Sequence, residues 1–356
     1  MKKILIGLAA VLAVSVSAPA AFAQDKTKAC FLYIGSKTDG GWTQAHDIGR
    51  QMVDKELGDK VETVFVENVP EGPDAERAIE RLARSGCKIV FTTSFGFMDQ
   101  TVAVAAKFPD VKFEHATGYK TAPNLAVYNS RFYEGRYIQG QIAAKMSKKG
   151  VAGYIASFPI PEVVMGINAF TLGAQSVNPD FKLKVVWANT WFDAGKEADA
   201  AKVLIDQGVD IITQHTDSTG PMQVAAERGI MAFGQASDMI AAGPKTQLTA
   251  IVDTWGPYYV KRIKAVQDGS WATGNIWDGL KDGILTMAPY TNMPDDVKKL
   301  AEETEAKIKS GELKPFTGPI TKQDGTEWLK AGESADDKTL SGLNFYVKGV
   351  DDKLPQ

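Results

Sequence analysis

Aromatic and acidic side chains recur in this sequence where short apolar segments end. The aromatic residues at these positions are Trp42, Phe95, Phe97, Trp191, Phe192 and Trp255. The acidic ones are Asp217, Asp238 and Asp253. Aromatic rings hold a flat ligand by stacking, and carboxylates accept hydrogen bonds from N–H groups. The set therefore predicts a site for a flat, neutral heterocycle that carries N–H groups, with a neutral sugar as the second choice. For any one ring alone, the alternative is that it packs its own loop onto the protein.

Charge narrows the class of ligand and partner. No lysine or arginine accompanies these carboxylates, which argues against an anionic ligand such as phosphate, a nucleotide or an amino-acid carboxylate. The whole chain has a net charge of −3, with 40 basic and 43 acidic residues. Proteins that bind nucleic acid need a basic surface for the phosphate backbone. We therefore expect a neutral small-molecule ligand and no nucleic acid.

Motifs that carry catalysis are missing from the sequence. The histidines, His46, His115 and His215, have no metal-ligand spacing among themselves or with the cysteines. There is no G-x-S-x-G elbow, Walker loop or G-x-G-x-x-G fingerprint. We expect structural histidines, no metal, no cofactor and no enzyme. The rival from another class is a secreted α/β enzyme such as a nucleoside hydrolase, which would need clustered aspartates or a nucleophile–base pair.

The first residues predict a cleavable signal peptide, residues 1–23. Lys2 and Lys3 give a positive start, residues 4–18 form an apolar run, and residues 21–23 form an A-x-A cleavage signature. A signal-anchor helix is the alternative, but the apolar run is short for a membrane span. Cys30 lies too far beyond the cleavage point to carry a lipid anchor. We therefore expect export to the periplasm without membrane attachment.

The rest of the chain alternates short apolar segments with helical patterns, twice in succession. With 356 residues, 44% of them hydrophobic, it is long enough for about two domains. The first series predicts strands at 29–35, 61–67, 87–93, 111–116 and 125–129, with helices at 42–57, at 73–86 and after Phe97. The second predicts strands at 151–156, 184–189, 210–214, 230–235 and 248–253, with helices at 161–177, 195–208 and 221–229.

This order predicts an α/β fold of two doubly wound, Rossmann-like lobes joined by a hinge. The helix at 258–269 should return to the first lobe, and the charged helix at 293–312 should form a solvated cover. We expect a first lobe of residues 24–130 plus about 254–285. The second lobe is then 131–253 plus about 286–356.

The cysteines, Cys30 and Cys87, each begin a predicted strand of the first lobe. In a doubly wound sheet of order 2-1-3-4-5, the first and third strands are neighbours. Cα atoms of neighbouring strands lie close to the separation that a disulfide needs, about 5.5 Å. Because an exported protein meets oxidising conditions, the placement predicts a disulfide. The alternative is two small buried hydrophobic residues.

Several longer motifs together resemble one family. These are TDGGWTQAHDIGR (38–50), SFGFMD (94–99), YEGRYIQGQIAA (133–144), INAFTLGAQSVNPD (167–180) and DQGVDIITQ (206–214). Over residues 29–290 the chain resembles the basic-membrane-protein group of ABC-transporter substrate-binding proteins, which includes the purine nucleoside receptors. The resemblance implies a type I periplasmic-binding-protein fold whose lobes close on a purine. It also implies an inner-membrane ABC permease as partner, and we expect a monomer.

The resemblance also assigns residues to the purine site. The family's base-stacking aromatic matches Trp42, with Thr43 in place of the Asn that follows it. The F-x-F-x-D loop of the family appears as Phe95, Phe97 and Asp99, and its second-lobe aromatic as Trp191 or Phe192.

Two family positions that hold the ribose differ in this sequence. The ribose-holding Asp aligns with Ala236, and the Lys that reaches the ribose aligns with Asp253. Trp255 has the bulk to fill the space that the ribose would take. The resemblance therefore implies a free base such as adenine or hypoxanthine, with a purine nucleoside as the alternative.

Overall fold

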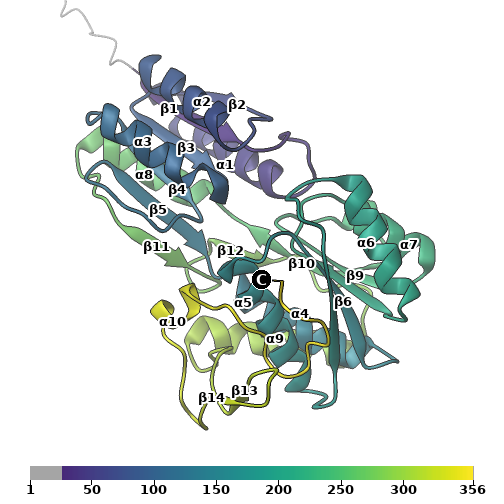
Figure 1. The fold of residues 1–356 in the computed structure, drawn as a ribbon. Coiled ribbons are helices and arrows are strands. Elements are labelled where there is room, and N and C mark those ends of the chain that lie inside the picture. Colours follow the sequence, from purple (N-terminus) through teal and green to yellow (C-terminus); the bar gives the residue numbers. More distant parts are fainter. Residues whose placement is uncertain (1–25, 356) are drawn as a thin grey trace, which may run out of the picture.

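The computed structural model describes residues 26–355 and has two α/β lobes (Figure 1). The predicted signal peptide lies outside these residues. Each lobe is built on a six-stranded sheet, and a small two-stranded sheet lies near the C-terminal end. None of the helices in residues 26–355 is long and apolar enough to cross a membrane.

The sheet of the first lobe has the strand order β11-β5-β4-β3-β1-β2, with parallel pairing throughout. Its strands are β1 (Thr27–Tyr33), β2 (Val61–Val66), β3 (Ile89–Thr93), β4 (Lys112–Ala116), β5 (Leu125–Ser130) and β11 (Asn275–Asp278). The helices of this lobe are α1 (Trp42–Leu57), α2 (Pro73–Arg84), α3 (Met98–Lys107) and α8 (Gly256–Asp268), with short 3₁₀ turns η1 (Gly58–Lys60) and η2 (Phe95–Phe97). Helix α8 packs against α1, so the predicted return of the chain to the first lobe is confirmed.

The second sheet repeats this plan in the order β12-β10-β9-β8-β6-β7. Its strands are β6 (Val151–Ala156), β7 (Lys182–Trp187), β8 (Ile211–Gln214), β9 (Met231–Gly234), β10 (Gln247–Asp253) and β12 (Leu285–Met287), which is antiparallel to β10. Its helices are α4 (Phe132–Met146), α5 (Pro161–Gln175), α6 (Ala194–Asp206) and α7 (Gly220–Arg228), with the 3₁₀ turn η3 (Ile240–Ala242). Both sheets contain the predicted 2-1-3-4-5 order, and the added edge strands β11 and β12 were not predicted.

The C-terminal part of the chain wraps the second lobe. It comprises α9 (Asp295–Ser310), β13 (Ile320–Thr321), β14 (Glu327–Leu329) and α10 (Asp337–Ser341). Helix α9 packs on α4, and Val350 pairs with Leu183 at the edge of β7. In Figure 1 these yellow segments lie beside α4 and α5. The predicted helix at 293–312 is therefore confirmed, and the segment after it adds a strap that was not predicted.

The predicted disulfide is confirmed. Cys30 in β1 is bonded to Cys87, two residues before β3, and their Cα atoms are 6.0 Å apart. The bond is possible because β1 and β3 pair in parallel, with Ala29 opposite Ile89. Both cysteines are buried in the layer between the sheet and helices α2 and α3.

Candidate ligand-binding site

A small cavity lies between the lobes, at the carboxyl ends of the strands of both sheets. Its volume is about 30 Å³, well below the roughly 300–1,000 Å³ of small-molecule sites, so the lobes lie close together here. The residues that line it are Trp42, Ser94, Phe95, Thr117, Glu162, Trp191, His215, Asp217 and Gln235. Ligands of doubly wound folds bind beyond the carboxyl ends of the strands, so this is where the fold places a ligand.

Aromatic rings from both lobes form walls of the cavity. Trp42 begins α1, and its indole N–H donates to the carbonyl of Thr93 at the end of β3, at 2.7 Å. Phe95 follows the same strand, and Trp191 comes from the second lobe, where it packs edge-on against Phe158 at 5.0 Å between ring centroids. Three rings from two lobes therefore face one cavity.

Trp255 supports this wall from behind. It is completely buried and does not line the cavity. Its ring packs edge-on against Trp42 at 5.5 Å and stacks on His46 at 4.9 Å. Trp255 therefore holds the Trp42 ring in place.

Two buried carboxyl groups in this region have no cation bonded to them, but only Asp217 lines the cavity, and the predicted site residue Asp253 does not. Asp217 lines the cavity, and burial together with the nearby charges of Asp39, Glu197 and Asp253 raises its pKa well above its ordinary value. Asp253 ends β10 and is 5% exposed, and neither of its oxygens has a hydrogen-bond partner among the described residues. Burial, reinforced by the charge of Glu162, raises the pKa of Asp253 well above its ordinary value.

Glu162 and His215 form the polar pair of the cavity wall. The carboxylate of Glu162, in the first turn of α5, lies 3.6 Å from Nε2 of His215 and accepts a hydrogen bond from the side chain of Asn129 at 2.8 Å. Burial lowers the pKa of His215, and the Glu162 carboxylate opposes that shift. His215, which the sequence predicts to be structural, lines the cavity.

A buried arginine lies behind the wall. Arg136 on α4 donates to the carbonyl of Gln214 at 2.6 Å, to the hydroxyl of Thr213 at 3.1 Å and to the side-chain oxygen of Gln235. Its guanidinium also lies 5.3 Å from the centre of the Tyr154 ring. This network ties the C-terminal ends of β8 and β9 to α4.

The two lobes touch at the start of α1. The hydroxyl of Ser237 donates to the carbonyl of Gly40, and a Cβ atom on Gly41 would lie 2.4 Å from the carbonyl oxygen of Asp217. Asp39 fixes this turn, because its carboxylate accepts from the backbone N–H groups of Gly41 at 2.9 Å and Thr43 at 2.9 Å. The glycines of the turn thus allow backbone of one lobe to approach backbone of the other.

Several predicted site residues lie outside the cavity. Phe97 is completely buried in the core between the first sheet and its helices. Asp99 is exposed and pairs with Lys120 at 2.6 Å, while Phe192 is 45% exposed. Because these side chains point into the core or to solvent, the structure does not bring them to the ligand.

Asp238 and Thr43, also predicted as site residues, do not line the cavity. Asp238 is exposed, and its carboxylate accepts from the side chain of Gln247 at 2.7 Å and from the backbone N–H of Ile240 at 3.1 Å. Thr43 is buried one residue beyond Trp42 and does not line the cavity. Asp238 therefore braces the start of η3, and Thr43 lies inside the fold.

Several residues of the wall were not predicted from the sequence. They are Ser94, Thr117, Glu162 and Gln235, each of which lies at or next to the end of a predicted strand or the start of a predicted helix. Their position was the available signal, but a single polar residue at a strand end carries no sign of whether it faces inward.

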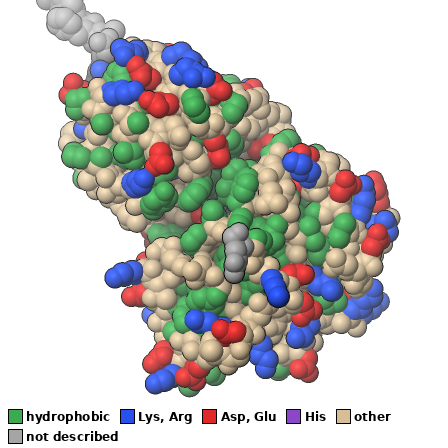
Figure 2. Space-filling view, viewed as in Figure 1, with side chains coloured by type: hydrophobic (Ala, Val, Ile, Leu, Met, Phe, Trp, Pro, Cys, Tyr) green, Lys and Arg blue, Asp and Glu red, His purple; other side chains and the backbone are tan. Residues whose placement is uncertain are grey.

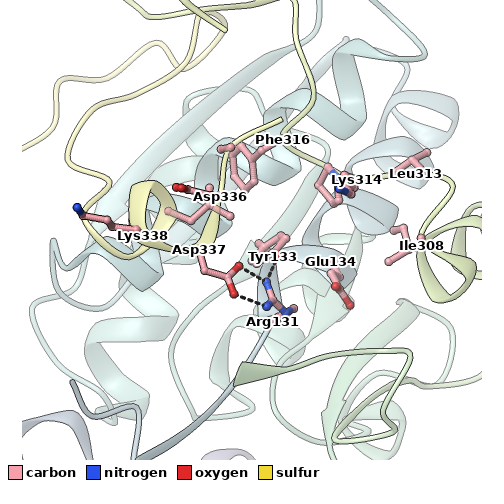
Figure 3. A pocket seen from close by; sticks show the side chains of 14 residues that line it. Arg131, Tyr133, Glu134, Ile308, Leu313, Lys314, Phe316, Asp336, Asp337 and Lys338 are labelled. Carbon is pink, nitrogen blue, oxygen red and sulfur yellow. Dashed lines mark hydrogen bonds and ion pairs between the residues drawn. The ribbon is translucent and has the colours of Figure 1, made fainter. Parts of the chain in front are cut away.

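A second cavity, larger than the first, lies between α4 and the C-terminal part of the chain (Figure 3). Its volume is about 640 Å³, and its walls come from α4, α9, α10 and residues 313–316. Arg131 and Asp337 face each other across it with two hydrogen bonds of 2.7 Å. Arg131 and Asp337 thus neutralise each other in this wall.

The face shown in Figure 2 carries interspersed basic and acidic side chains. Within residues 26–355, no group of three or more His, Cys, Asp or Glu side chains is arranged to hold a metal ion.

Comparisons with known proteins agree on one family. Residues 26–317 match the family model described as "ABC transporter substrate-binding protein PnrA-like". The chain is 72% identical to a purine-binding protein of Brucella abortus (strain 2308), over 95% of this chain and 96% of that one. It is 35% identical to a putative ABC transporter glucose-binding protein of Haloferax volcanii, over 93% of this chain and 82% of that one.

Solved structures share the fold at lower identity. A solute-binding protein of an ABC transporter system from Aeropyrum pernix K1 has a TM-score of 0.70 at 21% identity, over 81% of this chain and 92% of that one. One from Conexibacter woesei has a TM-score of 0.66 at 19% identity, over 81% of this chain and 98% of that one. The predicted two-lobed α/β fold is therefore confirmed.

Proposed function

This chain belongs to the Bmp family of PnrA-like ABC transporter substrate-binding proteins, and we propose that it captures a free purine base, adenine or hypoxanthine, between its lobes. The family has the type I periplasmic-binding-protein fold. Its members act outside the cytoplasmic membrane and work with a permease that lies in that membrane. We further propose that this chain works as a periplasmic monomer after removal of residues 1–23, and that the permease reads the closed form.

The observation that supports the proposal is the pairing of aromatic walls with a buried carboxyl group, Asp217, that has no cation bonded to it. Trp42, Phe95 and Trp191 offer faces or edges to a flat ring, and Asp217 lines the same cavity. A buried acceptor without a partner is costly, so a ligand that brings N–H groups gains by satisfying it. A purine base has a flat ring and N–H groups together. The purine-binding name of the Brucella abortus relative supports the same ligand class.

The free base is favoured over the nucleoside by the residues at the end of β10 and in the loop after β9. Ala236 is completely buried and offers no side-chain acceptor to a ribose hydroxyl. Asp253 presents a carboxylate where a cationic donor would serve the ribose, and it suits a ring N–H of an unsubstituted base.

Calorimetry with adenine, hypoxanthine, adenosine, inosine and glucose tests the proposal. We expect a base to bind at least tenfold more tightly than its nucleoside, a difference of about 1.4 kcal/mol. The glucose measurement tests the neutral-sugar alternative, which the name of the Haloferax volcanii relative favours. Glucose binding without base binding, or equal affinities for base and nucleoside, would contradict the free-base proposal. Chromatography of the incubated mixtures tests the hydrolase rival, since a binding protein forms no product.

A double substitution adds a test of the base preference. Ala236→Asp with Asp253→Lys restores the two family groups that hold a ribose, and we expect it to narrow the gap between base and nucleoside. Ala236 has a left-handed backbone with φ of 60°, a conformation that Asp tolerates better than most residues. A gap that stays unchanged in a folded double variant would mean that these positions do not set the preference.

A further inference from the structure

Gln235 is an amide in the cavity wall whose orientation is fixed from behind. It directly follows β9 and lines the inter-lobe cavity. Its side-chain oxygen, Oε1, accepts a hydrogen bond from Arg136. Among the described residues, its Nε2 amide group donates to no partner. The free end of this amide is therefore a donor.

Arg136 leaves the amide of Gln235 only this orientation. A guanidinium has donors and no acceptor, so the oxygen of the amide must face it. A flipped amide would set N–H groups against N–H groups in a buried place, which costs free energy. Arg136 is itself completely buried and anchored on Thr213, Gln214 and the ring of Tyr154. Because these contacts fix the guanidinium of Arg136, it cannot move away from a flipped Gln235 amide.

We propose that Arg136 is a positioning residue that holds Gln235 as a fixed hydrogen-bond donor, and that Gln235 selects a heterocycle with an acceptor atom at that edge. The acceptor would be an unprotonated ring nitrogen or a carbonyl oxygen. The carboxylates of Asp217 and Glu162 in the same wall accept hydrogen bonds instead. The ligand must therefore present acceptors as well as N–H donors. This inference rests on the proposed function, since it places a purine in this cavity.

The decisive variant is Gln235→Glu, which keeps the shape of the side chain and replaces its donor with an oxygen. The new carboxylate lies against Arg136, so the charge is compensated. The matched control is Gln139→Glu. The side-chain oxygen of Gln139 also accepts from Arg136, at 3.0 Å, but Gln139 does not line the cavity. We expect Gln235→Glu to weaken adenine or hypoxanthine binding at least about tenfold. Gln139→Glu should bind as the wild type does.

A second readout separates donor loss from general damage. Calorimetry with adenine and with 1-, 3- and 7-deazaadenine removes one ring acceptor at a time. In the wild type, one of these analogues should bind at least about tenfold more weakly than adenine. In Gln235→Glu and in Arg136→Met that ratio should fall toward one, because the fixed donor is gone or free to turn. A purely structural defect would weaken all ligands and leave the ratio unchanged.

The outcomes distinguish this inference from the proposed function. A wild-type protein that binds no purine would overturn both. A wild type that binds purines while Gln235→Glu binds them equally, or while Gln139→Glu loses as much, would overturn only the donor role of Gln235. If Gln235→Glu does not fold, the deaza series on the wild type still decides: equal affinity for adenine and all three analogues overturns the inference.

Discussion

At the residue scale, Trp42 belongs both to the cavity wall and to a cluster of rings beneath it. Base–aromatic stacking contributes about 1–3 kcal/mol per base. We therefore expect Trp42→Ala to weaken purine binding by about that amount, and Trp42→Phe to weaken it less because a ring remains. Phe113→Ala is the control, since Phe113 is completely buried in the first lobe and does not line the cavity. It should mainly lower the free energy of unfolding, by about 3–5 kcal/mol. Titration calorimetry and denaturant unfolding measure both quantities, and unchanged affinity in Trp42→Ala would contradict the stacking role.

Asp253 should make the ligand-free protein less stable as the pH rises. Its pKa in the folded protein is raised above the ordinary value of about 3.9. At pH values between the pKa of Asp253 in the unfolded chain and its higher pKa in the folded protein, the folded chain holds a proton that the unfolded chain has released. The free energy of unfolding contributed by this group is therefore highest near pH 4 or below and falls as the pH rises.

Asp253→Asn removes that proton equilibrium. We expect the variant to be more stable than the wild type at neutral pH and to approach it near pH 4, in denaturant unfolding without ligand. In the variant, the free energy of unfolding should depend less on pH than in the wild type. Some dependence should remain, because the raised pKa of Asp217 acts in the same direction. The lowered pKa of His215 acts in the opposite direction, below its ordinary value of about 6.5. Asp99→Asn is the matched control on the surface. A variant less stable than wild type at neutral pH would refute the argument.

The residues also show how far a site can be predicted from sequence. Trp42, Phe95, Trp191 and Asp217 lie in the cavity because each follows a strand, and strand ends are readable from apolar segments. Asp238 follows a strand too, yet it turns back to brace its own loop. The direction of a loop side chain depends on contacts from other elements, which a sequence pattern does not contain.

At the scale of elements, the disulfide joins β1 to the segment before β3 across 57 residues. A crosslink over a loop of this length contributes up to about 4 kcal/mol by restricting the unfolded chain. We expect Cys30→Ala with Cys87→Ala to lower the free energy of unfolding by up to that amount. The wild-type protein from the periplasm, denatured without reductant, should show no reactive thiol. Two reactive thiols in that titration would mean that the bond does not form in the cell.

The elements themselves were largely predictable, and the exceptions have a physical reason. Buried parallel strands are continuous apolar runs, and α1 begins and ends at the predicted residues, Trp42 and Leu57. The edge strand β12 has only three residues, and the strap beyond α9 follows the surface of the second lobe. Such segments are positioned by tertiary pairing and carry little periodicity of their own.

At the scale of the whole molecule, binding requires that the lobes meet, and Gly41 is the point of closest backbone approach described above. A Cβ atom there would lie 2.4 Å from the carbonyl oxygen of Asp217, which is far inside van der Waals contact. Gly41→Ala should therefore oppose closure of the lobes.

We expect Gly41→Ala to keep the lobes apart and to weaken purine binding at least tenfold, which corresponds to about 1.4 kcal/mol. Its radius of gyration, measured by small-angle X-ray scattering with saturating ligand, should exceed that of the wild type. Gly274→Ala is the matched control, since a Cβ atom there meets open space. A Gly41→Ala protein that closes and binds like the wild type would show that the lobes reach their binding geometry without this contact, so that the ligand alone sets the closed state.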